Sequence, residues 1–432
     1  MKFASVTLLS FAAVVSSAKV SYNGAKAFRI PVGEDVAPLM EVIHKLDLPI
    51  WKGAPGGVPI ANSHVDLVVP AKDVKNFQKM TSSMVTEVMH EDLGASIDAE
   101  GSAAANSTAA ANLSWFDAYH EYADHITFLN ELVALNSTQS EIVIIGTSSE
   151  GRPITGIHFW GASGKGIKPA IILHGTVHAR EWITTMTTEY LAYYLLQNYG
   201  SSAEIKFFVD KYDFYIFPVV NPDGFVYTQT TNRLWRKSRQ VVPYSTCLNN
   251  STCGANSTCV GRDINRNWPF QWDVPGGASS DPCSDVFKGF AAGDATENKI
   301  LVAHTNMIKA TQGLQLYIDI HSYSQLFMTP YGYSCTAVAN NSESLNSLAA
   351  GASAAIHSIY GTNFTSGPIC STIYQATGTS VDYINDVTKS NYTFVMELRD
   401  TGTYGFVLPA DQILPTSVET YAGLRHLLLN MV

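Results

Sequence analysis

The sequence predicts an α/β protein with two folded parts, a small α+β open sandwich followed by a larger domain with a mixed sheet flanked by helices. Three observations predict this organisation. Up to about residue 96 the apolar patterns follow the order β-α-β-β-α-β, residues 97–112 contain few large apolar side chains, and strand and helix patterns then alternate to the end of the chain. A length of 432 residues is also too great for one ordinary compact domain.

Short apolar runs and one clear helical repeat define the small domain, which is predicted to occupy residues 19–96. Leu39, Val42 and Ile43 recur at the spacing of one helix face. The predicted elements, in chain order, are strand Ala27–Pro31, helix Val36–Leu46, strands Ile50–Trp51 and His64–Val69, helix Asp73–Met84 and strand Thr86–His90. This order is that of a ferredoxin-like open sandwich.

A segment rich in Gly, Ala, Ser and Asn separates the two domains. Residues 97–112 contain no large apolar residue after Ile97, which predicts an exposed linker. The chain also contains no Lys or Arg between Lys79 and Arg152. A protease that cuts after basic residues therefore has no site in this linker.

Apolar strands and helical patterns alternate through the larger domain, which is predicted to span residues 113–432. Such alternation favours a parallel or mixed sheet covered on both faces, and sheets of this kind bind ligands at the carboxyl ends of their strands. The predicted strands are Glu141–Ile145, Pro153–Trp160, Pro169–His174, Asp213–Val220, Leu314–Ile320 and Tyr392–Leu398. The predicted helices are Phe116–Leu135, Glu181–Asn198, Ile300–Ala310, Ser347–Tyr360 and Thr416–Leu429.

Residues 1–18 predict a cleaved secretory signal peptide. Lys2 provides a positive start, an apolar run extends from Val6 to Val15, and Ser16 and Ala18 provide small residues for cleavage. A buried helix or a membrane anchor is the alternative, but the run is short against the roughly 20 residues that span a bilayer. No later segment has a transmembrane pattern, so no membrane association is expected.

Cysteine usage and glycosylation motifs agree with secretion. The six cysteines all lie between Cys247 and Cys370, and an even number without a Cys-x2-Cys pair fits disulfides in an oxidising compartment. Motifs for N-glycosylation begin at Asn106, Asn112, Asn136, Asn249, Asn250, Asn256, Asn340, Asn363 and Asn391. The expected location is extracellular, with a vacuole-like compartment as the alternative.

The charge distribution argues against a nucleic-acid partner. The formal net charge is -10, and no run of Lys and Arg occurs in the chain. The acidity is expected to serve solubility, and a monomer is the expected state.

A pair of metal-ligand residues follows one of the predicted strands. In the segment AIILHGTVHAREW, His178 and Glu181 are separated by two residues, a spacing that lets both side chains face one point across a single turn. A catalytic zinc takes three protein ligands and an open fourth position. His321, at the end of the apolar run LQLYIDIH, is the best candidate for the third ligand. The His-x-x-Glu pair alone is a weak signal, because two surface residues at a helix start would look the same.

Six motifs taken together closely resemble the zinc metallocarboxypeptidases of the pancreatic carboxypeptidase A type. They are HAREWI at 178–183, NRLWRK at 232–237, DINRNW at 263–268, IHSYSQ at 320–325, IYQATG at 373–378 and ELRDTGTYGF at 397–406. The resemblance covers the whole chain, since those proteins also carry an N-terminal pro-domain of open-sandwich type. It implies a mixed eight-stranded sheet, a secreted proenzyme, an activating protease, and C-termini of peptides or proteins as substrates.

The resemblance also implies roles for individual residues. His178, Glu181 and His321 would bind one Zn²⁺, and Asp263 would orient His178. Glu397 would act as general base and acid, and Arg236 would stabilise the developing oxyanion. The substrate's terminal carboxylate would be bound by Asn265, Arg266 and Tyr374, while Arg180 would line the substrate groove.

The side-chain preference is predicted from the position seven residues after the clamp tyrosine. Relatives specific for basic residues carry Asp there, whereas this sequence has Val381. An apolar floor cannot pair with Lys or Arg, so a neutral aromatic or aliphatic C-terminal residue is expected. Ile369 and Ala376 match other neutral walls, and Thr379 replaces the usual Gly. We hypothesise that its bulk shifts the preference from Trp toward Phe, Leu or smaller side chains.

The cysteine pairs and the alternatives also follow from the resemblance. Cys259 and Cys283 match a disulfide common in the family, Cys335 and Cys370 match one found in some members, and Cys247 and Cys253 remain as a local pair. The sequence leaves two other functions open, an exopeptidase of B-type or broad specificity and a non-catalytic peptide-binding relative on the same fold.

Overall fold

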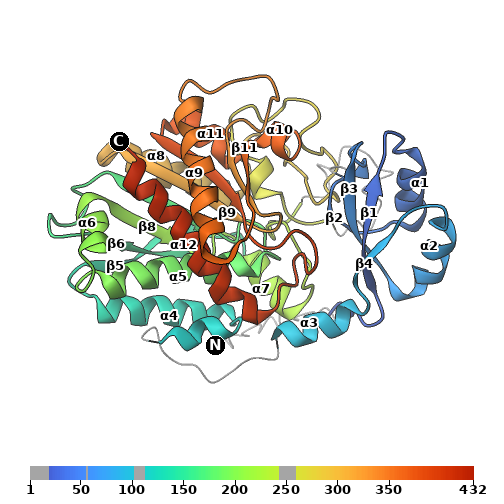
Figure 1. The fold of residues 1–432 in the computed structure, drawn as a ribbon, viewed down its shortest axis with the longest axis horizontal. Coiled ribbons are helices and arrows are strands. Elements are labelled where there is room, and N and C mark those ends of the chain that lie inside the picture. The colour runs from blue at the N-terminus through green and yellow to red at the C-terminus, as the bar shows by residue number, and fades with distance from the viewer. Residues whose placement is uncertain (1–18, 55–56, 102–111, 243–258) are drawn as a thin grey trace, which may run out of the picture.

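The computed structural model describes residues 19–54, 57–101, 112–242 and 259–432. Two sheets organise this part of the chain, one of four strands and one of eight, and Figure 1 shows them side by side. The predicted signal peptide at 1–18 and the pair Cys247 and Cys253 lie outside the described residues. Within them, no helix combines the length and apolar character needed to cross a bilayer.

The small domain is a four-stranded antiparallel sheet with two helices, as predicted. Its strand order is β2-β3-β1-β4. Alternate residues of β1 and β3, such as Phe28, Ile30, Val65 and Leu67, are buried against the helices and form one apolar core with Phe77. The elements are β1 (Lys26–Val32), α1 (Ala37–Leu46), β2 (Ile50–Lys52), β3 (Ser63–Val69), α2 (Val74–Met80) and β4 (Glu87–His90).

The helix α3 (Leu93–Gly101) differs from the prediction of an exposed linker beginning at residue 97. Glu100, in its last turn, is buried and bonds Arg233 of the larger domain. The two glycines of α3 disfavour a helix intrinsically, so this tertiary contact helps to hold it. Residues 102–111 of the predicted linker lie outside the described residues.

The larger domain contains a mixed sheet of eight strands in the order β11-β10-β12-β9-β7-β8-β6-β5. Its central strands β12, β9, β7 and β8 are parallel. Strand β6 is antiparallel to both β8 and β5, and β10 is antiparallel to β12 but parallel to β11. The strands are β5 (Ser140–Thr147), β6 (Pro153–Phe159), β7 (Ala170–Gly175), β8 (Asp213–Phe217), β9 (Leu314–His321), β10 (Leu326–Thr329), β11 (Thr365–Pro368) and β12 (Tyr392–Glu397). The predicted fold class is confirmed.

Helices cover both faces of this sheet, because its central strands are apolar on both sides. Ile171 and Leu173 of β7 belong to one core, and Ala170 and Ile172 to the other. The first core is closed by α4 (Tyr122–Leu135), α5 (Trp182–Asn198), α6 (Ala203–Lys211), α9 (Ser342–Tyr360) and α12 (Ile413–Asn430). The second core is closed by α8 (Thr296–Thr311) and α11 (Ser380–Tyr383). Two further helices are α7 (Pro222–Thr230) and α10 (Ile369–Thr372).

The predicted helix Phe116–Leu135 is too long at its start. A 3-10 turn covers Leu113–Asp117, the backbone at Ala118 is extended, and α4 begins at Tyr122. Trp115 and Phe116 are buried in the first core, so tertiary packing holds this 3-10 turn apart from α4.

Candidate metal centre and peptide-binding pocket

The carboxyl ends of three neighbouring parallel strands bring the candidate site together. His178 and Glu181 follow β7, His321 ends β9, and Glu397 ends β12. Strands β9 and β12 pair in parallel with His321 opposite Glu397. The backbone register therefore places a predicted metal ligand and the predicted base beside each other, at the edge where such sheets bind ligands.

Three buried side chains direct their ligand atoms at one point. His178 Nδ1 lies 2.8 Å from Glu181 Oε1, His321 Nδ1 lies 3.0 Å from Glu181 Oε2, and the two Nδ1 atoms are 3.0 Å apart. Two imidazole nitrogens that converge on each other and on a carboxylate form the donor set of a His2Glu zinc site. The residues present therefore fit Zn²⁺.

The far nitrogens of both imidazoles are held by carboxylates. His178 Nε2 lies 3.0 Å from Asp263 Oδ1, as predicted for an orienting carboxylate. His321 Nε2 lies 3.2 Å from Asp319 Oδ2, a contact that the sequence analysis missed. Residues 319 and 321 lie on the same face of β9, so the period of two along a strand was the available signal. Such contacts fix the tautomer and orientation of metal-binding histidines.

Arg236 joins this network from the loop after α7. Its Nη2 donates to Asp263 Oδ2 at 2.9 Å, and its Nη1 lies 4.0 Å from Glu181 Oε1. Burial opposes ionisation of Asp263, but Arg236 and His178 outweigh it and hold the pKa of that carboxyl well below its usual range. Asp263 thus stays charged and keeps both Arg236 and His178 in place.

Glu397 lies in the same pocket, but its electrostatic environment differs from that of Asp263. Desolvation in the pocket and the nearby Glu181 carboxylate raise the pKa of Glu397 to about 8. Of the charged groups described around it, His321, Lys52 and Arg236 act in the opposite direction. A carboxyl group with a raised pKa is suited to exchanging a proton near neutral pH.

Asn265, Arg266 and Tyr374, the predicted carboxylate clamp, line the same pocket. Arg266 Nη1 donates to the backbone oxygen of Asn265 at 2.8 Å, and its Nη2 lies 3.4 Å from the hydroxyl of Tyr374. Asn265 Oδ1 accepts a hydrogen bond from the backbone N–H of Ser380, which fixes the amide. Arg180 lies farther out, with Nη1 3.1 Å from Asp285 and its guanidinium over the ring of Phe406.

Apolar side chains form the inner part of the pocket. Val381 is buried among them, and Thr379, also buried, contributes to the same wall. The apolar and small residues that line it are Met328, Ile369, Ile373, Ala376, Thr379, Val381 and Val395. The predicted pocket residues Ile369, Ala376 and Val381 are therefore brought together.

The small domain covers the entrance to this pocket. Trp51 and Lys52 of β2 line it, and Lys52 Nζ donates to Ser324 Oγ. Behind them, Tyr323 donates its hydroxyl to Asp66 at 2.6 Å, and Trp51 packs edge-on against Phe406. The sequence analysis predicted no contact residues of the small domain, because these contacts depend on how the domains dock.

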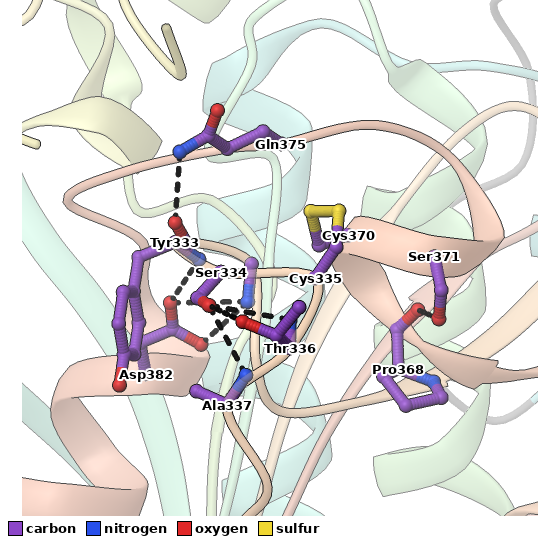
Figure 2. The surroundings of a disulfide bond; sticks show 11 residues. Tyr333, Ser334, Cys335, Thr336, Ala337, Pro368, Cys370, Ser371, Gln375 and Asp382 are labelled. Carbon is purple, nitrogen blue, oxygen red and sulfur yellow. Dashed lines mark hydrogen bonds between the residues drawn. A yellow bond between two sulfur atoms is a disulfide. The ribbon is translucent and has the colours of Figure 1, made fainter. Parts of the chain in front are cut away.

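Two of the three expected disulfides fall within the described residues. Cys259 bonds Cys283, and Cys335 bonds Cys370, each with Cα atoms 4.8 Å apart. The second disulfide joins the segment at Cys335 to α10, which contains Cys370, and Figure 2 shows its surroundings.

Comparisons with known families agree with this geometry. Residues 125–423 match the family model described as zinc carboxypeptidase. Residues 33–100 match the model described as carboxypeptidase activation peptide. The two matches correspond to the larger and the small domain.

Individual relatives resemble the chain over nearly its whole length. It is 47% identical over 424 residues to metallocarboxypeptidase A of Trichophyton equinum, covering 97% of this chain and 96% of that protein. It is 38% identical over 392 residues to carboxypeptidase A2 of Mus musculus, covering 90% of this chain and 88% of that protein. The crystal structure of thrombin activatable fibrinolysis inhibitor superposes with a TM-score of 0.85 at 27% identity, covering 95% of this chain and 99% of that one.

Proposed function

The chain belongs to the zinc carboxypeptidase family, and from that premise we propose that it removes single C-terminal residues with neutral aromatic or aliphatic side chains from peptides and proteins. It is a metallocarboxypeptidase with an activation-peptide domain. The observation that carries the specificity is the apolar pocket around Val381, beside the clamp of Asn265, Arg266 and Tyr374.

His178, Glu181 and His321 are proposed to hold the metal. Zn²⁺ bound there would polarise the scissile carbonyl and lower the pKa of a bound water toward about 7. Asp263 and Asp319 keep the two imidazoles in the tautomer with Nδ1 available as a ligand.

Glu397 and Arg236 are proposed to carry the acid–base and electrostatic parts of the reaction. Glu397 accepts a proton from the attacking water and delivers it to the leaving amine. Arg236, fixed by Asp263, presents a charge to the oxygen that becomes negative in the transition state. Its position is set before substrate binds, so little reorganisation is needed.

The clamp explains why cleavage would occur at the C-terminus. The planar guanidinium of Arg266 can bind a carboxylate through two parallel hydrogen bonds, with Asn265 and Tyr374 beside it. An internal peptide bond offers no carboxylate at that place. The distance from clamp to metal ligands then selects the last peptide bond.

Thr379 is proposed to limit the size of the accepted side chain. Its side chain is buried in the pocket wall where the family usually has Gly. We expect Phe or Leu to be preferred over Trp. Steady-state kinetics on matched peptides ending in Phe, Leu, Trp and Ala would contradict this if Trp were best.

The activation-peptide domain implies release by a protease. We propose that cleavage occurs between residues 102 and 112, because the chain up to Gly101 is helical and docked. The absence of Lys and Arg between Lys79 and Arg152 calls for a protease without basic preference. A mature N-terminus that follows a basic residue would contradict this.

Secretion and a monomeric state are part of the same proposal. The sequence of residues 1–18, the cysteines and the glycosylation motifs support an extracellular or vacuole-like location. The proposed alternatives are B-type or broad specificity, disfavoured by Val381, and a non-catalytic binding role.

One assay tests the proposal. The full-length protein is processed with a subtilisin-type protease and given blocked peptides ending in Phe or Lys, with and without a zinc chelator. Chelator-sensitive release of Phe, with Lys released far more slowly, is expected. Faster release of Lys would favour B-type specificity, and no release from correctly cleaved, zinc-loaded protein would favour a binding role.

A further inference from the structure

A buried carboxylate beside the pocket has no established part in the site. Asp382 follows the pocket residue Val381 in α11 and is fully buried. It accepts hydrogen bonds from the backbone N–H of Gly332 at 3.0 and 3.1 Å and from that of Tyr333 at 2.9 Å. Figure 2 shows both carboxylate oxygens directed at this backbone.

The backbone segment 331–333 is bonded in turn to the loop that carries the clamp tyrosine. The N–H of Cys370 donates to Tyr331 O, and the N–H of Ala376 donates to Gly332 O, both at 2.9 Å. Gln375 Nε2 donates to Tyr333 O at 2.9 Å. Tyr374 lies between these anchor points. Segment 331–333 therefore connects α11 with both ends of the Tyr374 loop.

Packing around Gly332 leaves little freedom for this segment. A Cβ atom at Gly332 would lie 2.7 Å from Ala376 O and 3.4 Å from the methyl groups of Ile369 and Thr379. All three neighbours belong to residues that line the apolar pocket. A shift of segment 331–333 would therefore move the pocket walls.

Asp382 has no cationic partner among the described residues. The groups that act on it are backbone N–H donors, the Thr379 hydroxyl and the like charge of Asp386, with the tyrosines at 331 and 333 nearby. Burial and Asp386 raise the pKa of Asp382 to about 7. A buried carboxylate without a cationic partner adds little net stability, so what Asp382 contributes is the geometry that it imposes on the backbone it bonds.

We infer that Asp382 is a positioning residue for substrate recognition, which holds the walls of the apolar pocket and the Tyr374 loop in place through the backbone of Gly332 and Tyr333. Asp382 does not touch the substrate. This inference deepens the proposed function and rests on it, since the pocket is taken to receive the C-terminal side chain.

The test is the variant Asp382→Asn, made in the full-length protein and processed like the wild type. An amide places an N–H₂ group against backbone N–H donors, so at least one hydrogen bond is lost. For a peptide ending in Phe, KM is expected to rise about tenfold while kcat changes less than about twofold. For a peptide ending in Ala, which uses little of the pocket, KM is expected to change less than about threefold.

The matched control is Asp386→Asn, which removes a nearby negative charge but no acceptor of the Gly332 or Tyr333 N–H, and whose amide oxygen can still accept from the Tyr331 hydroxyl. Its Phe/Ala preference is expected to equal that of the wild type. An equal loss of preference in both variants would overturn the proposal, because charge rather than anchoring would be responsible. A uniform loss of kcat in Asp382→Asn, without a change in preference, would show a merely structural role and also overturn it.

Two measurements keep the test decisive if that variant fails to fold or if the wild type proves to have another specificity. In the wild type, KM for the Phe peptide is expected to rise below about pH 7, and more than KM for the Ala peptide. The protection of amides in segments 331–333 and 369–376 against hydrogen exchange, taken relative to the intrinsic exchange rate at each pH, is expected to fall in the same pH range, whatever peptide is cleaved. The inference would be refuted if neither this protection nor the Phe/Ala ratio of KM changed with pH. An inactive wild type whose amide protection falls in this range would instead refute the proposed function alone.

Discussion

Glu100 and Arg233 form a doubly hydrogen-bonded ion pair, with both N–O distances at 2.6 Å, and both side chains are buried although they come from different domains. Arg233 also donates to the backbone oxygens of Arg180 and Phe406, two residues beside the proposed substrate groove. The end of α3 is thus joined directly to the region that we expect it to leave on activation.

Removing the carboxylate of this pair should weaken the proenzyme. Glu100→Ala leaves the Arg233 charge buried without its partner, a change that typically costs about 3–5 kcal/mol. We expect a lower thermal midpoint and measurable peptidase activity before cleavage. Glu91→Ala, which removes an exposed ion pair with Lys26 in the small domain, is the control and should shift stability by less than about 1 kcal/mol. Equal effects of the two variants would contradict the prediction.

Acid should weaken the docking of the small domain. His90 Nε2 lies 2.8 Å from the backbone oxygen of Tyr404, its ring packs against Trp51, and burial lowers its pKa. A docked state with a depressed histidine pKa binds fewer protons than the separated domains, so docking loses free energy as pH falls below about 6.5. Size-exclusion chromatography of the cleaved protein at pH 7.5 and 5 measures this. His90→Gln should reduce the pH dependence, and the surface variant His357→Gln should not.

The carboxylate clamp should govern substrate binding more than turnover. Arg266→Ala removes the guanidinium that faces Tyr374, and losing one partner of a buried charge-assisted contact typically costs about 2–5 kcal/mol. We expect kcat/KM to fall by about 10² or more. The wild type should strongly prefer a free C-terminus over the same peptide with a C-terminal amide. A variant that keeps this preference would show that the clamp lies elsewhere.

The pocket floor should determine which side chain is accepted. Val381→Asp places a carboxylate in the apolar wall, so kcat/KM for a peptide ending in Phe should fall at least about tenfold while hydrolysis of a Lys-ended peptide becomes detectable. The variant Val381→Asn introduces a polar side chain with the shape of Asp but without its charge, so it separates the effect of charge from that of polarity. If Val381→Asn gained the same activity on Lys, charge pairing would not be the cause.

Asp319 should influence metal affinity without binding the metal. Asp319→Asn removes the carboxylate from His321 Nε2, and loss of such an orienting contact typically lowers metal affinity about 10–100-fold. Chelator competition measures the zinc affinity. The exposed variant Asp273→Asn serves as control. Unchanged zinc affinity in Asp319→Asn would mean that Asn265, which lies 3.2 Å from the same nitrogen, is sufficient to orient it.

The sequence predicted those parts of the site that depend on local order. His178 and Glu181 share one turn, and periodicity predicted the apolar strands β7, β9 and β12, which His178, His321 and Glu397 follow or end. The expected roles of these residues as metal ligands and base came from the six motifs that resemble the family, because the His-x-x-Glu pair alone is a weak signal. The short strands β10 and β11 were missed, because four residues give too little pattern to separate them from loops.

Contacts between distant segments could not be predicted in the same way. The bonds from Asp382 to Gly332 and Tyr333 join residues about fifty positions apart, and Lys52 reaches Ser324 across a domain interface. Burial of Glu100 likewise depends on a partner in the other domain, which is why a composition typical of linkers folded as a helix.

The pairing of His321 with Glu397 across β9 and β12 has a consequence for how this protein can change. The offset between the proposed metal ligand and the proposed base is set by main-chain hydrogen bonds, so it does not depend on the loops that connect the two strands. Insertions and deletions in those loops can alter recognition and processing while the spacing of the chemical groups stays constant. A one-residue slip in the sheet, by contrast, would turn one of these side chains to the opposite face and separate the pair in a single step.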